Sequence, residues 1–288
     1  MSPDAGELRG LSATTTVVGV VGDPVRHSLS PRLHNAAFAE LGLDWVSVGF
    51  PVAAGRLEDA LIGMRALGIR GLSVTMPHKE DAAAAVDRRS GRADRLRSVN
   101  CITNDDGVLT GDSTDGQGFV DALRHDGRTA PEDLRCLVVG AGGAARSVVL
   151  ALAEHGARQV VVVNRTATRA AEAAALAGGV GRVGTLADLP DADLVVDATP
   201  AGMAGGPEGL WDRASLDALR PGQVVVDLVY APARTPLLDA AADRGAVAMN
   251  GLGMLVHQAA RQLATWTGTE PPVAAMWRSV APAPGSYA

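Results

Sequence analysis

The stretch CLVVGAGGAARSVVLALAE, residues 136–154, decides the fold of this chain. Its first four residues are apolar and include two valines, as in strands that are buried on both faces of a sheet. A Gly-x-Gly-x-x-Ala pattern follows from Gly140 to Ala145, and apolar residues at helical spacing come after it. This order of strand, glycine turn and helix predicts one unit of a parallel sheet that is covered by helices.

The small residues of the turn each have a physical role. Gly140 permits a tight turn, Gly142 lets the backbone approach a pyrophosphate group, and Ala145 allows the helix to pack closely on the strand. The amino terminus of the helix attracts phosphate groups. Ordinary turns also favour glycine, but the strand before the pattern and the helix after it favour a dinucleotide-binding site. The expected cofactor contacts from this turn are Gly140, Ala141, Gly142, Gly143 and Ala144.

The next strand, residues 160–164, predicts which nucleotide is bound. Sites for NAD usually carry Asp or Glu at the end of this strand, to hold the ribose hydroxyls. This chain instead has Asn164, Arg165 and Thr166, with Arg169 one turn later. A carboxylate would repel a 2′-phosphate, whereas arginine can bind it, so we expect NADP as the cofactor. The alternative is that both arginines are solvated surface groups.

The alternation of strands with alanine-rich stretches continues along the second half of the chain. Further strands are expected at residues 194–198, 224–228 and 246–249. The near-continuous valines of 160–163 and 224–226 indicate strands in the interior of a parallel sheet. Thr199 ends one strand at the edge where ligands of open parallel sheets bind.

The first half also alternates strands with helices. Strands are expected at 17–21, 46–50, 69–75 and 99–103, and helices at 33–41 and 57–67. A stretch rich in Gly, Asp, Ser and Thr runs from Gly111 to Gly118, and we interpret it as the loop that crosses between two domains. With 288 residues and 47% apolar content, the chain can form two hydrophobic cores.

Composition excludes several classes of protein. The net charge of −6 and the pI near 5.5 argue against sequence-independent nucleic-acid binding. The chain lacks the uninterrupted window of about 18 apolar residues that a membrane span needs. Residues 1–10 lack the apolar core of a secretory signal, so a cytoplasmic location is expected. Cys101 and Cys136 lack the spacing of a zinc or redox pair, and we expect buried, unreactive thiols.

Three polar groups near strand ends are candidates for substrate chemistry. Ser28 and Ser30 are two residues apart, so in an extended segment their hydroxyls would point to one side and bind a carboxylate. The alternative is that Ser30 caps the helix that begins at Pro31. Lys79 lies just inside an expected helix start, where the helix dipole disfavours a cation, so a functional role is favoured.

Asp115 supplies a carboxylate at the expected crossing between the domains, where a cleft facing the nicotinamide would form. The alternative is that Asp115 caps a helix. The surrounding sequence does not match a calcium-binding loop, because Ala122 stands at the place of the closing Glu and the first and third ligand positions lack Asp or Asn.

Collinear stretches over nearly the whole chain resemble the shikimate dehydrogenase family. They are residues 22–35, 73–79, 98–100, 111–119, 140–146, 164–169, 198–203, 227–238 and 251–259. The resemblance implies an α/β fold with an N-terminal α/β substrate domain, a Rossmann-type NADP-binding domain and a C-terminal helix that returns to the first domain. We expect these parts at residues 1–115, 116–250 and 251–288.

The resemblance also implies roles for individual residues. Lys79 and Asp115 would be the catalytic pair, without a metal, while Ser28 and Ser30 would bind the substrate carboxylate. The other implied substrate contacts are Thr75, Asn100, Asp115, Tyr230 and Gln258. Further implied cofactor contacts are Thr199, Leu228 and Gly251. The implied reaction is the NADPH-dependent, reversible reduction of 3-dehydroshikimate to shikimate in aromatic amino acid biosynthesis, by a monomer or homodimer.

Three small residues depart from the family pattern. Ser73 and Ser113 each stand where Asn is usual, and Cys101 stands where Thr is common. Because Lys79 and Asp115 are unchanged, we expect the redox chemistry to be retained. A quinate or aminoshikimate dehydrogenase is the alternative within the family, and a non-catalytic NADP-binding sensor is the alternative from another class.

Overall fold

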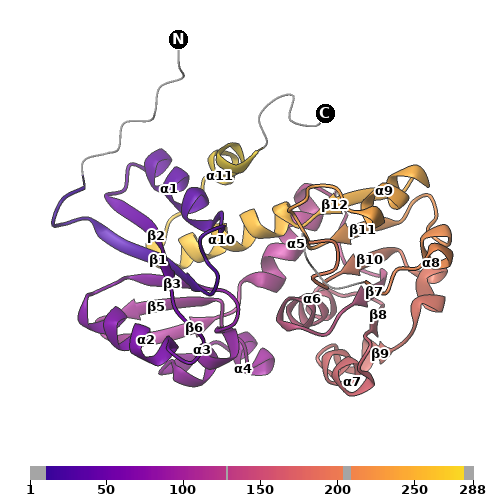
Figure 1. Ribbon diagram of the computed structural model, residues 1–288, viewed down its shortest axis with the longest axis horizontal. Coiled ribbons are helices and arrows are strands. Elements are labelled where there is room, and N and C mark those ends of the chain that lie inside the picture. Colours follow the sequence, from indigo (N-terminus) through magenta and orange to yellow (C-terminus); the bar gives the residue numbers. More distant parts are fainter. Residues whose placement is uncertain (1–10, 128, 204–208, 282–288) are drawn as a thin grey trace, which may run out of the picture.

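Two six-stranded sheets, one from each half of the chain, carry the fold (Figure 1). The computed structural model describes residues 11–127, 129–203 and 209–281. Two helices, α5 (Asp115–His125) and α10 (Leu252–Thr267), lie between the sheets. The α/β class expected from the sequence is confirmed.

Residues 16–112 form the first sheet and its helices. In chain order the elements are β1 (Thr16–Gly22), α1 (Ser30–Leu41), β2 (Trp45–Pro51), α2 (Leu57–Ala66), β3 (Gly71–Val74), α3 (Lys79–Ala85), β4 (Arg88–Arg89), α4 (Gly91–Leu96), β5 (Cys101–Asp105) and β6 (Val108–Asp112). The strand order is β2-β1-β3-β5-β6-β4, and β1 pairs in parallel with β2 and β3. Asp106 and Gly107 both have positive φ angles, as a two-residue hairpin turn requires, so β5 and β6 are antiparallel.

Residues 135–250 form the second sheet and its helices. In chain order the elements are β7 (Arg135–Val139), α6 (Gly143–Glu154), β8 (Gln159–Val163), α7 (Ala167–Ala175), β9 (Gly181–Val183), β10 (Leu194–Asp197), α8 (Arg213–Asp217), β11 (Val224–Asp227), α9 (Pro236–Asp243) and β12 (Val247–Asn250). Every strand pair is parallel, in the order β12-β11-β10-β7-β8-β9. The valine-rich β8 and β11 lie inside the sheet, as their sequences indicate. The strand order reverses beside β7, and ligands of such sheets bind at that point.

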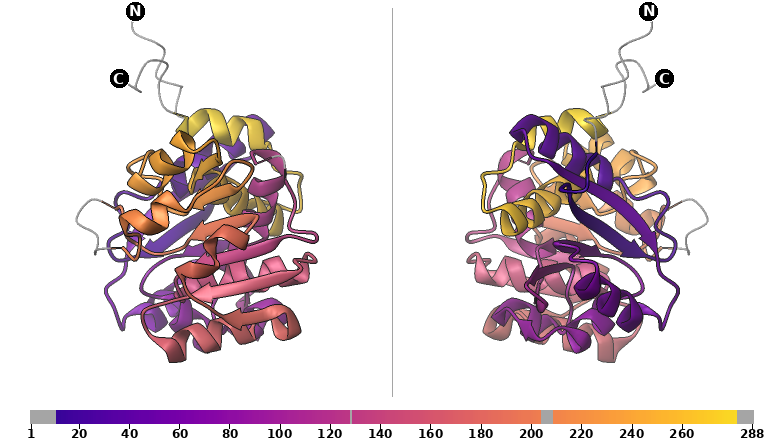
Figure 2. Two further views of the ribbon diagram at one scale, coloured as in Figure 1. Left: turned by 90° about the vertical axis from the view of Figure 1, so that its right-hand side faces the viewer. Right: turned by 90° about the vertical axis from the view of Figure 1, so that its left-hand side faces the viewer.

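The C-terminal helices return to the first sheet and cover one of its faces (Figure 2). Side chains of α1, α10 and α11 (Val273–Val280) form a single core with this sheet, and Trp266 of α10 is 2% exposed within it. The Trp266 indole N–H donates to the carbonyl of Ile102, at 3.1 Å. The C-terminal return implied by the resemblance is therefore confirmed. Among the described helices, none has both the length and the apolar character that crossing a bilayer requires.

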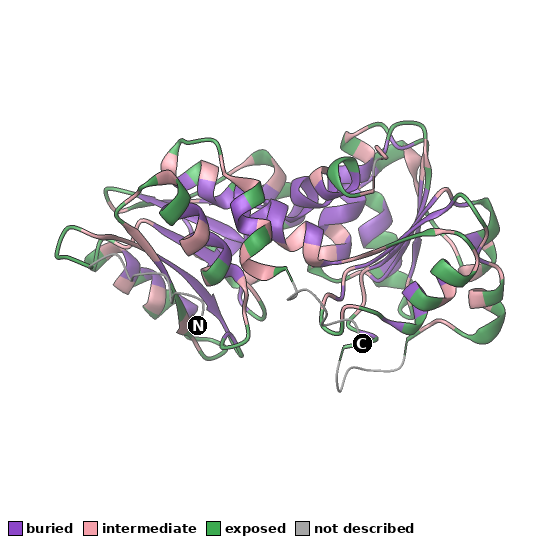
Figure 3. Cartoon of the chain, turned by 90° about the horizontal axis from the view of Figure 1, so that it is seen from above, coloured by how far each residue is buried: buried purple, intermediate pink, exposed green. Residues whose placement is uncertain are grey.

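The prediction of a loop from Gly111 to Gly118 is wrong. Gly111 belongs to β6, and α5 already begins at Asp115. Gly116 and Gly118 allow close packing between helices and do not form a flexible turn. A Cβ at Gly116 would lie 2.4 Å from the carbonyl oxygen of Ser147 in α6, and one at Gly118 would lie 2.4 Å from the backbone nitrogen of Gln258 in α10. Helix α5 therefore lies directly against both helices, and this region is largely buried (Figure 3).

The contact between Gly118 and Gln258 predicts a large effect of a single methyl group. We expect Gly118→Ala to lower the free energy of unfolding by about 1–3 kcal/mol, because helix backbone cannot move aside as a flexible side chain can. Gly63→Ala in α2 is the matched control, since a Cβ there meets no described atom within 4 Å. It should raise stability by about 0.5–1 kcal/mol through helix propensity. Urea unfolding followed by circular dichroism measures both, and equal effects would contradict the packing described here.

Candidate active site

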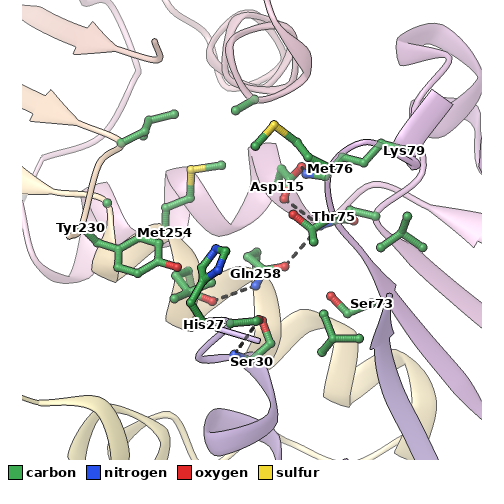
Figure 4. A pocket seen from close by; sticks show the side chains of 18 of the residues that line it. His27, Ser30, Ser73, Thr75, Met76, Lys79, Asp115, Tyr230, Met254 and Gln258 are labelled. Atoms are coloured by element: carbon green, nitrogen blue, oxygen red, sulfur yellow. Dashed lines mark hydrogen bonds and ion pairs between the residues drawn. The ribbon is translucent and has the colours of Figure 1, made fainter. Parts of the chain in front are cut away.

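A cavity of about 380 Å³ lies between the two sheets, and both halves of the chain form its wall (Figure 4). The first half contributes segments that follow β1 and β3, and the second half contributes the segment after β11 together with the start of α10. All residues that the sequence indicated as catalytic or substrate contacts line it. They are Ser28, Ser30, Thr75, Lys79, Asn100, Asp115, Tyr230 and Gln258.

The Lys79 ammonium and the Asp115 carboxylate form an ion pair in this wall (Figure 4). Nζ lies 2.5 Å from Oδ2, and the two side chains are 22% and 8% exposed. Each residue is the first of its helix, α3 and α5 respectively. The carboxylate therefore offsets the unfavourable position of a cation at a helix start. Thr114 occupies the N-cap position of α5, so the alternative that Asp115 caps this helix is wrong.

Asn100 fixes the other oxygen of this carboxylate. Its side-chain amide donates to Asp115 Oδ1 at 2.7 Å, and it also lies 3.2 Å from Gln258 Oε1. The backbone N–H of Thr114 donates to Asn100 Oδ1 at 2.7 Å. Because Asn100 is only 1% exposed, its polar atoms depend on these protein partners. The network orients the carboxylate and leaves its Oδ2 for Lys79.

Helix α10 closes the network from the C-terminal part of the chain. The Thr114 hydroxyl donates to the backbone carbonyl of Gln258 at 3.1 Å, and Gln258 Nε2 donates to the carbonyl of Leu255 at 2.9 Å. One turn further on, Gln262 Nε2 donates to the carbonyl of Asn100 at 2.9 Å. The amide of Gln258 is thereby held at the cavity wall, next to the ion pair.

Ser28 and Ser30 line the cavity, but the expected extended geometry is wrong. The segment is a turn that leads into α1, which begins at Ser30, and Leu29 has helical backbone angles. The N–H of Ser30 donates to Ser28 Oγ at 3.3 Å. Leu29 is the N-cap residue, and α1 has no side-chain cap hydrogen bond in the described structure. The alternative that Ser30 caps the helix is therefore also wrong.

Tyr230 and Thr75 complete the polar part of the wall. Tyr230 follows β11 and lies across the cavity from Lys79 (Figure 4). Burial raises the pKa of its phenol, so the group stays a neutral hydroxyl that can donate a hydrogen bond. Thr75 follows β3, and its backbone N–H donates to the carbonyl of Val21 at 2.9 Å. This bond fixes Thr75 at the carboxyl end of the first sheet.

The glycine turn after β7 leaves open space where a phosphate would bind. Gly140 has a φ of +113°, and a Cβ there would lie 3.1 Å from the carbonyl oxygen of Ala198. A Cβ at Gly142 or Gly143 would meet no described atom within 4 Å. Helix α6 begins at Gly143 and has no side-chain cap in the described structure. The start of α6 therefore has neither a side-chain cap nor a close described neighbour at these two glycines, as the approach of an anion requires.

The expected cofactor residues divide into two groups. Ala144, Leu228 and Gly251 line the cavity itself. The others lie along the carboxyl edge of the second sheet, outside the cavity wall. They are Gly140, Ala141, Gly142 and Gly143 after β7, Asn164, Arg165, Thr166 and Arg169 after β8, and Thr199 after β10. Arg165 and Arg169 are exposed, so the alternative of solvated arginines stays open.

Two buried carboxylates at the carboxyl edge of the second sheet were not predicted from the sequence. Asp197 ends β10 and accepts from the Thr199 N–H at 2.8 Å, and Asp227 ends β11 and accepts from the Val229 N–H at 2.9 Å and from the Thr235 hydroxyl at 2.7 Å. Burial raises the pKa of both, that of Asp227 to about 6. These bonds shape the loops that carry Thr199 and Tyr230. An Asp at the end of an apolar strand is the signal that would have identified them.

Several cavity residues had no signal in the sequence. They are His27, Met76 and Met203, from the segments that follow β1, β3 and β10, and Met254, from the first turn of α10. Of the three departures from the family pattern, Ser73 lines the cavity, whereas Ser113 and Cys101 are buried elsewhere. Cys101 and Cys136 are free and buried, so the predicted burial is confirmed. Burial raises the pKa of the Cys101 thiol, and it raises that of Cys136 to about 12, which disfavours the reactive thiolate form.

Three family models match consecutive parts of the chain. Residues 20–102 match the shikimate dehydrogenase substrate binding domain, residues 126–227 match shikimate / quinate 5-dehydrogenase, and residues 251–281 match the shikimate 5′-dehydrogenase C-terminal domain. The matched regions include most of both sheets and the whole of α10 and α11. Asp115, the partner of Lys79 in the ion pair, lies between the first two matched regions.

Relatives of known name match the chain along almost its full length. It is 43% identical to the shikimate dehydrogenase (NADP(+)) of Methanopyrus kandleri, over 94% of this chain and 96% of the relative. A crystal structure of a shikimate dehydrogenase in complex with NADP+ superposes with a TM-score of 0.86 at 36% identity, over 94% and 96% of the two chains. The Thermus thermophilus enzyme in complex with NADP(H) and shikimate gives 0.84 at 34% identity, over 92% and 98%. The chain therefore belongs to the shikimate dehydrogenase family.

Proposed function

We propose that this protein is an NADP-dependent shikimate dehydrogenase that reversibly reduces 3-dehydroshikimate to shikimate. The observation that carries the proposal is the Lys79–Asp115 ion pair in the wall of the interdomain cavity. The pair lies where the carboxyl edge of the second sheet meets the cavity, since Ala144 of the glycine turn lines the same space. A substrate in the cavity thus has a proton donor on one side and the nucleotide edge on the other.

Lys79 is the general acid of the proposed reaction. Bound NADPH supplies the hydride to the C3 carbonyl carbon. The Lys79 ammonium donates a proton to the carbonyl oxygen, which becomes the hydroxyl of shikimate. Asp115 orients the ammonium and stabilises its charge through the 2.5 Å contact. In the oxidative direction Lys79 takes the proton back.

The polar residues of the cavity wall would hold the substrate. Ser28 and Ser30 come from the turn before α1 and would bind the carboxylate. Three further lining residues, Thr75, Asn100 and Gln258, would contact the hydroxyls or the ring. Tyr230 would contact the substrate from the second half of the chain. Residues 1–115 would thus form the substrate domain, residues 116–250 the nucleotide domain, and residues 251–288 the segment that packs back on the first.

The second sheet has the features that a dinucleotide requires. The open space at Gly142 and Gly143 would admit the pyrophosphate to the first amides of α6. Arg165 and Arg169 would bind the 2′-phosphate at the end of β8, beside Asn164 and Thr166. Thr199, Leu228 and Gly251 would contact the nicotinamide half, because Leu228 and Gly251 line the cavity. We also propose a cytoplasmic enzyme that acts as a monomer or homodimer.

A quinate or aminoshikimate dehydrogenase is the second candidate, and Ser73 is the observation that favours it. The family usually has Asn at this position, and in this protein Ser73 lines the cavity. The family model for residues 126–227 also includes quinate in its description. A ring substituent at the substrate carbon nearest Ser73 would decide between the candidates.

Parallel assays of the purified protein test the proposed reaction. We expect NADPH absorbance to decay with 3-dehydroshikimate, and NADH or 3-dehydroquinate to give lower kcat/KM values. Faster turnover of 3-dehydroquinate would favour the second candidate. Activity on neither ketone, with retained NADPH binding, would favour a non-catalytic sensor and contradict the proposal.

Lys79→Arg separates proton donation from charge. Lys79 is the one lysine among the 26 basic Lys and Arg residues of the chain. Arginine keeps the positive charge beside Asp115, but its pKa above about 12 prevents proton transfer near neutral pH. We expect kcat to fall by about 10²-fold or more, with NADPH affinity unchanged.

Chemical modification of amines provides a control, because Lys79 is the one lysine of the chain. Trinitrobenzenesulfonate should inactivate the wild type as one side-chain amine reacts, and shikimate should protect it. The Lys79→Arg protein should show no side-chain reaction. Near-wild-type turnover of Lys79→Arg would remove Lys79 from the role of general acid.

Arg165→Ala tests the choice between NADP and NAD. A charge-assisted hydrogen bond to the 2′-phosphate contributes about 1.5–3 kcal/mol, so KM for NADPH should rise about 10- to 100-fold while KM for NADH changes little. Arg158→Ala is the matched control, because Arg158 is also exposed but precedes β8 at the opposite end of the strand. If Arg165→Ala and Arg158→Ala behave alike in steady-state kinetics, Arg165 is only a solvated surface group.

A further inference from the structure

Two histidines and an aspartate meet outside the cavity, where the end of α5 lies beside α10. The ligand atoms of His125, Asp126 and His257 all lie within 4.8 Å of one another. The two imidazole rings have centroids 5.5 Å apart, and His125 Nδ1 lies 2.7 Å from Asp126 Oδ1. In the part of the chain that the structure describes, this is the one group of three such side chains at metal-binding spacing.

His257 carries a buried nitrogen that lacks a partner. Its Nε2 has no hydrogen-bond partner among the described residues, and the residue is 7% exposed. Buried polar atoms in proteins are nearly always satisfied, by protein, water or an ion.

The other two groups give access from solvent and complete the ligand set. The side chain of His125 is 66% exposed and that of Asp126 is 26% exposed. A Cβ at Gly253 would lie only 2.4 Å from Asp126 Oδ2, so the glycine leaves the space that this carboxylate occupies. The cluster thus joins one deep imidazole to two groups that an ion can reach from outside.

We propose that His125, Asp126 and His257 bind a divalent transition-metal ion of the Zn²⁺ class, which ties the end of α5 to α10. Two imidazoles and one carboxylate are ligands that Zn²⁺ and its neighbours prefer over Mg²⁺ or Ca²⁺, which take oxygen ligands. Three protein ligands leave a coordination position for water. This site was not expected from the sequence, because His257 lies 132 positions after His125 and 131 after Asp126.

The ion would restrain the two helices that hold the Asn100 network. Helix α5 carries Asp115 at its start, and His257 directly precedes Gln258. The metal site lies at the opposite end of α5 from Asp115, so the ion takes no part in proton or hydride transfer. Because an ion that binds only the folded protein stabilises it, thermal stability should rise with metal concentration.

Isothermal titration calorimetry with ZnCl₂ tests the site directly, on untagged, EDTA-treated protein in a buffer that does not bind metal. We expect one Zn²⁺ per chain and a higher unfolding temperature. Co²⁺ should give the visible absorption bands of a site with nitrogen ligands. Cys101 and Cys136 are buried and do not compete.

Three histidine variants locate the ligands. We expect His125→Asn and His257→Asn each to weaken Zn²⁺ binding by at least about ten-fold and to abolish the rise in unfolding temperature. His155→Asn is the matched control, because His155 lies outside the cluster and contacts Gln117 at 3.1 Å. It should bind Zn²⁺ as the wild type does. Since His125 is a surface residue, its variant decides the outcome if His257→Asn fails to fold.

Three results would overturn the proposal. One is the absence of stoichiometric Zn²⁺ binding by the wild type. Another is unchanged binding by His125→Asn. The third is an equal loss in all three histidine variants, since binding would then not depend on the cluster.

Discussion

The buried amide of Asn100 joins three segments that are far apart in the sequence. Its side chain binds Thr114 and Asp115 at the start of α5 and Gln258 in α10, while its backbone carbonyl accepts from the N–H of Val74 in β3 at 2.8 Å. Losing one partner of a buried amide costs about 1–3 kcal/mol, because the other group stays unsatisfied. The position of the Asp115 carboxylate, and with it that of Lys79, therefore depends on contacts from both ends of the chain.

Close packing of α5 on α10 makes this network possible. Gly118 permits the approach at the cavity end of the contact, and Gly253 permits it at the other end, where Asp126 lies. The two helices run antiparallel, so their contact extends from the cavity to the surface. Because α10 also packs in the core of the first sheet, this one contact links that sheet to the nucleotide-binding edge of the second. The same geometry explains why a polar cluster with metal-binding spacing forms at its outer end.

The local sequence was enough to predict those strands and helices whose residue pattern has only one structural interpretation. The strand, glycine turn and helix of residues 135–154, the interior valine strands and the helix start at Lys79 were all recognisable. The structure of the stretch from Gly111 to Gly118 could not be predicted in this way. Glycine permits both turns and close contacts between helices, and the two cases differ only in whether another helix packs against the residue. The turn at Ser28 and Ser30 likewise depends on how the chain enters α1. The buried Asp197 and Asp227 gave a signal only through their place at strand ends.

This chain uses arginine for its structural ion pairs and has lysine only at position 79, where we propose a chemical role. Most ion pairs among the described residues use arginine, for example Arg261 with Asp121, where Nε and one terminal nitrogen bind the two carboxylate oxygens at 2.5 and 2.8 Å. The planar guanidinium suits such bidentate pairs and stays charged at every physiological pH. A proton donor needs the opposite property, since it must exist in both protonation states. The ammonium of Lys79 can lose its proton, and it is the one lysine side chain in the molecule. Charge alone would be served by arginine at position 79, so the presence of an amine there supports the proposed role of Lys79 as the proton donor.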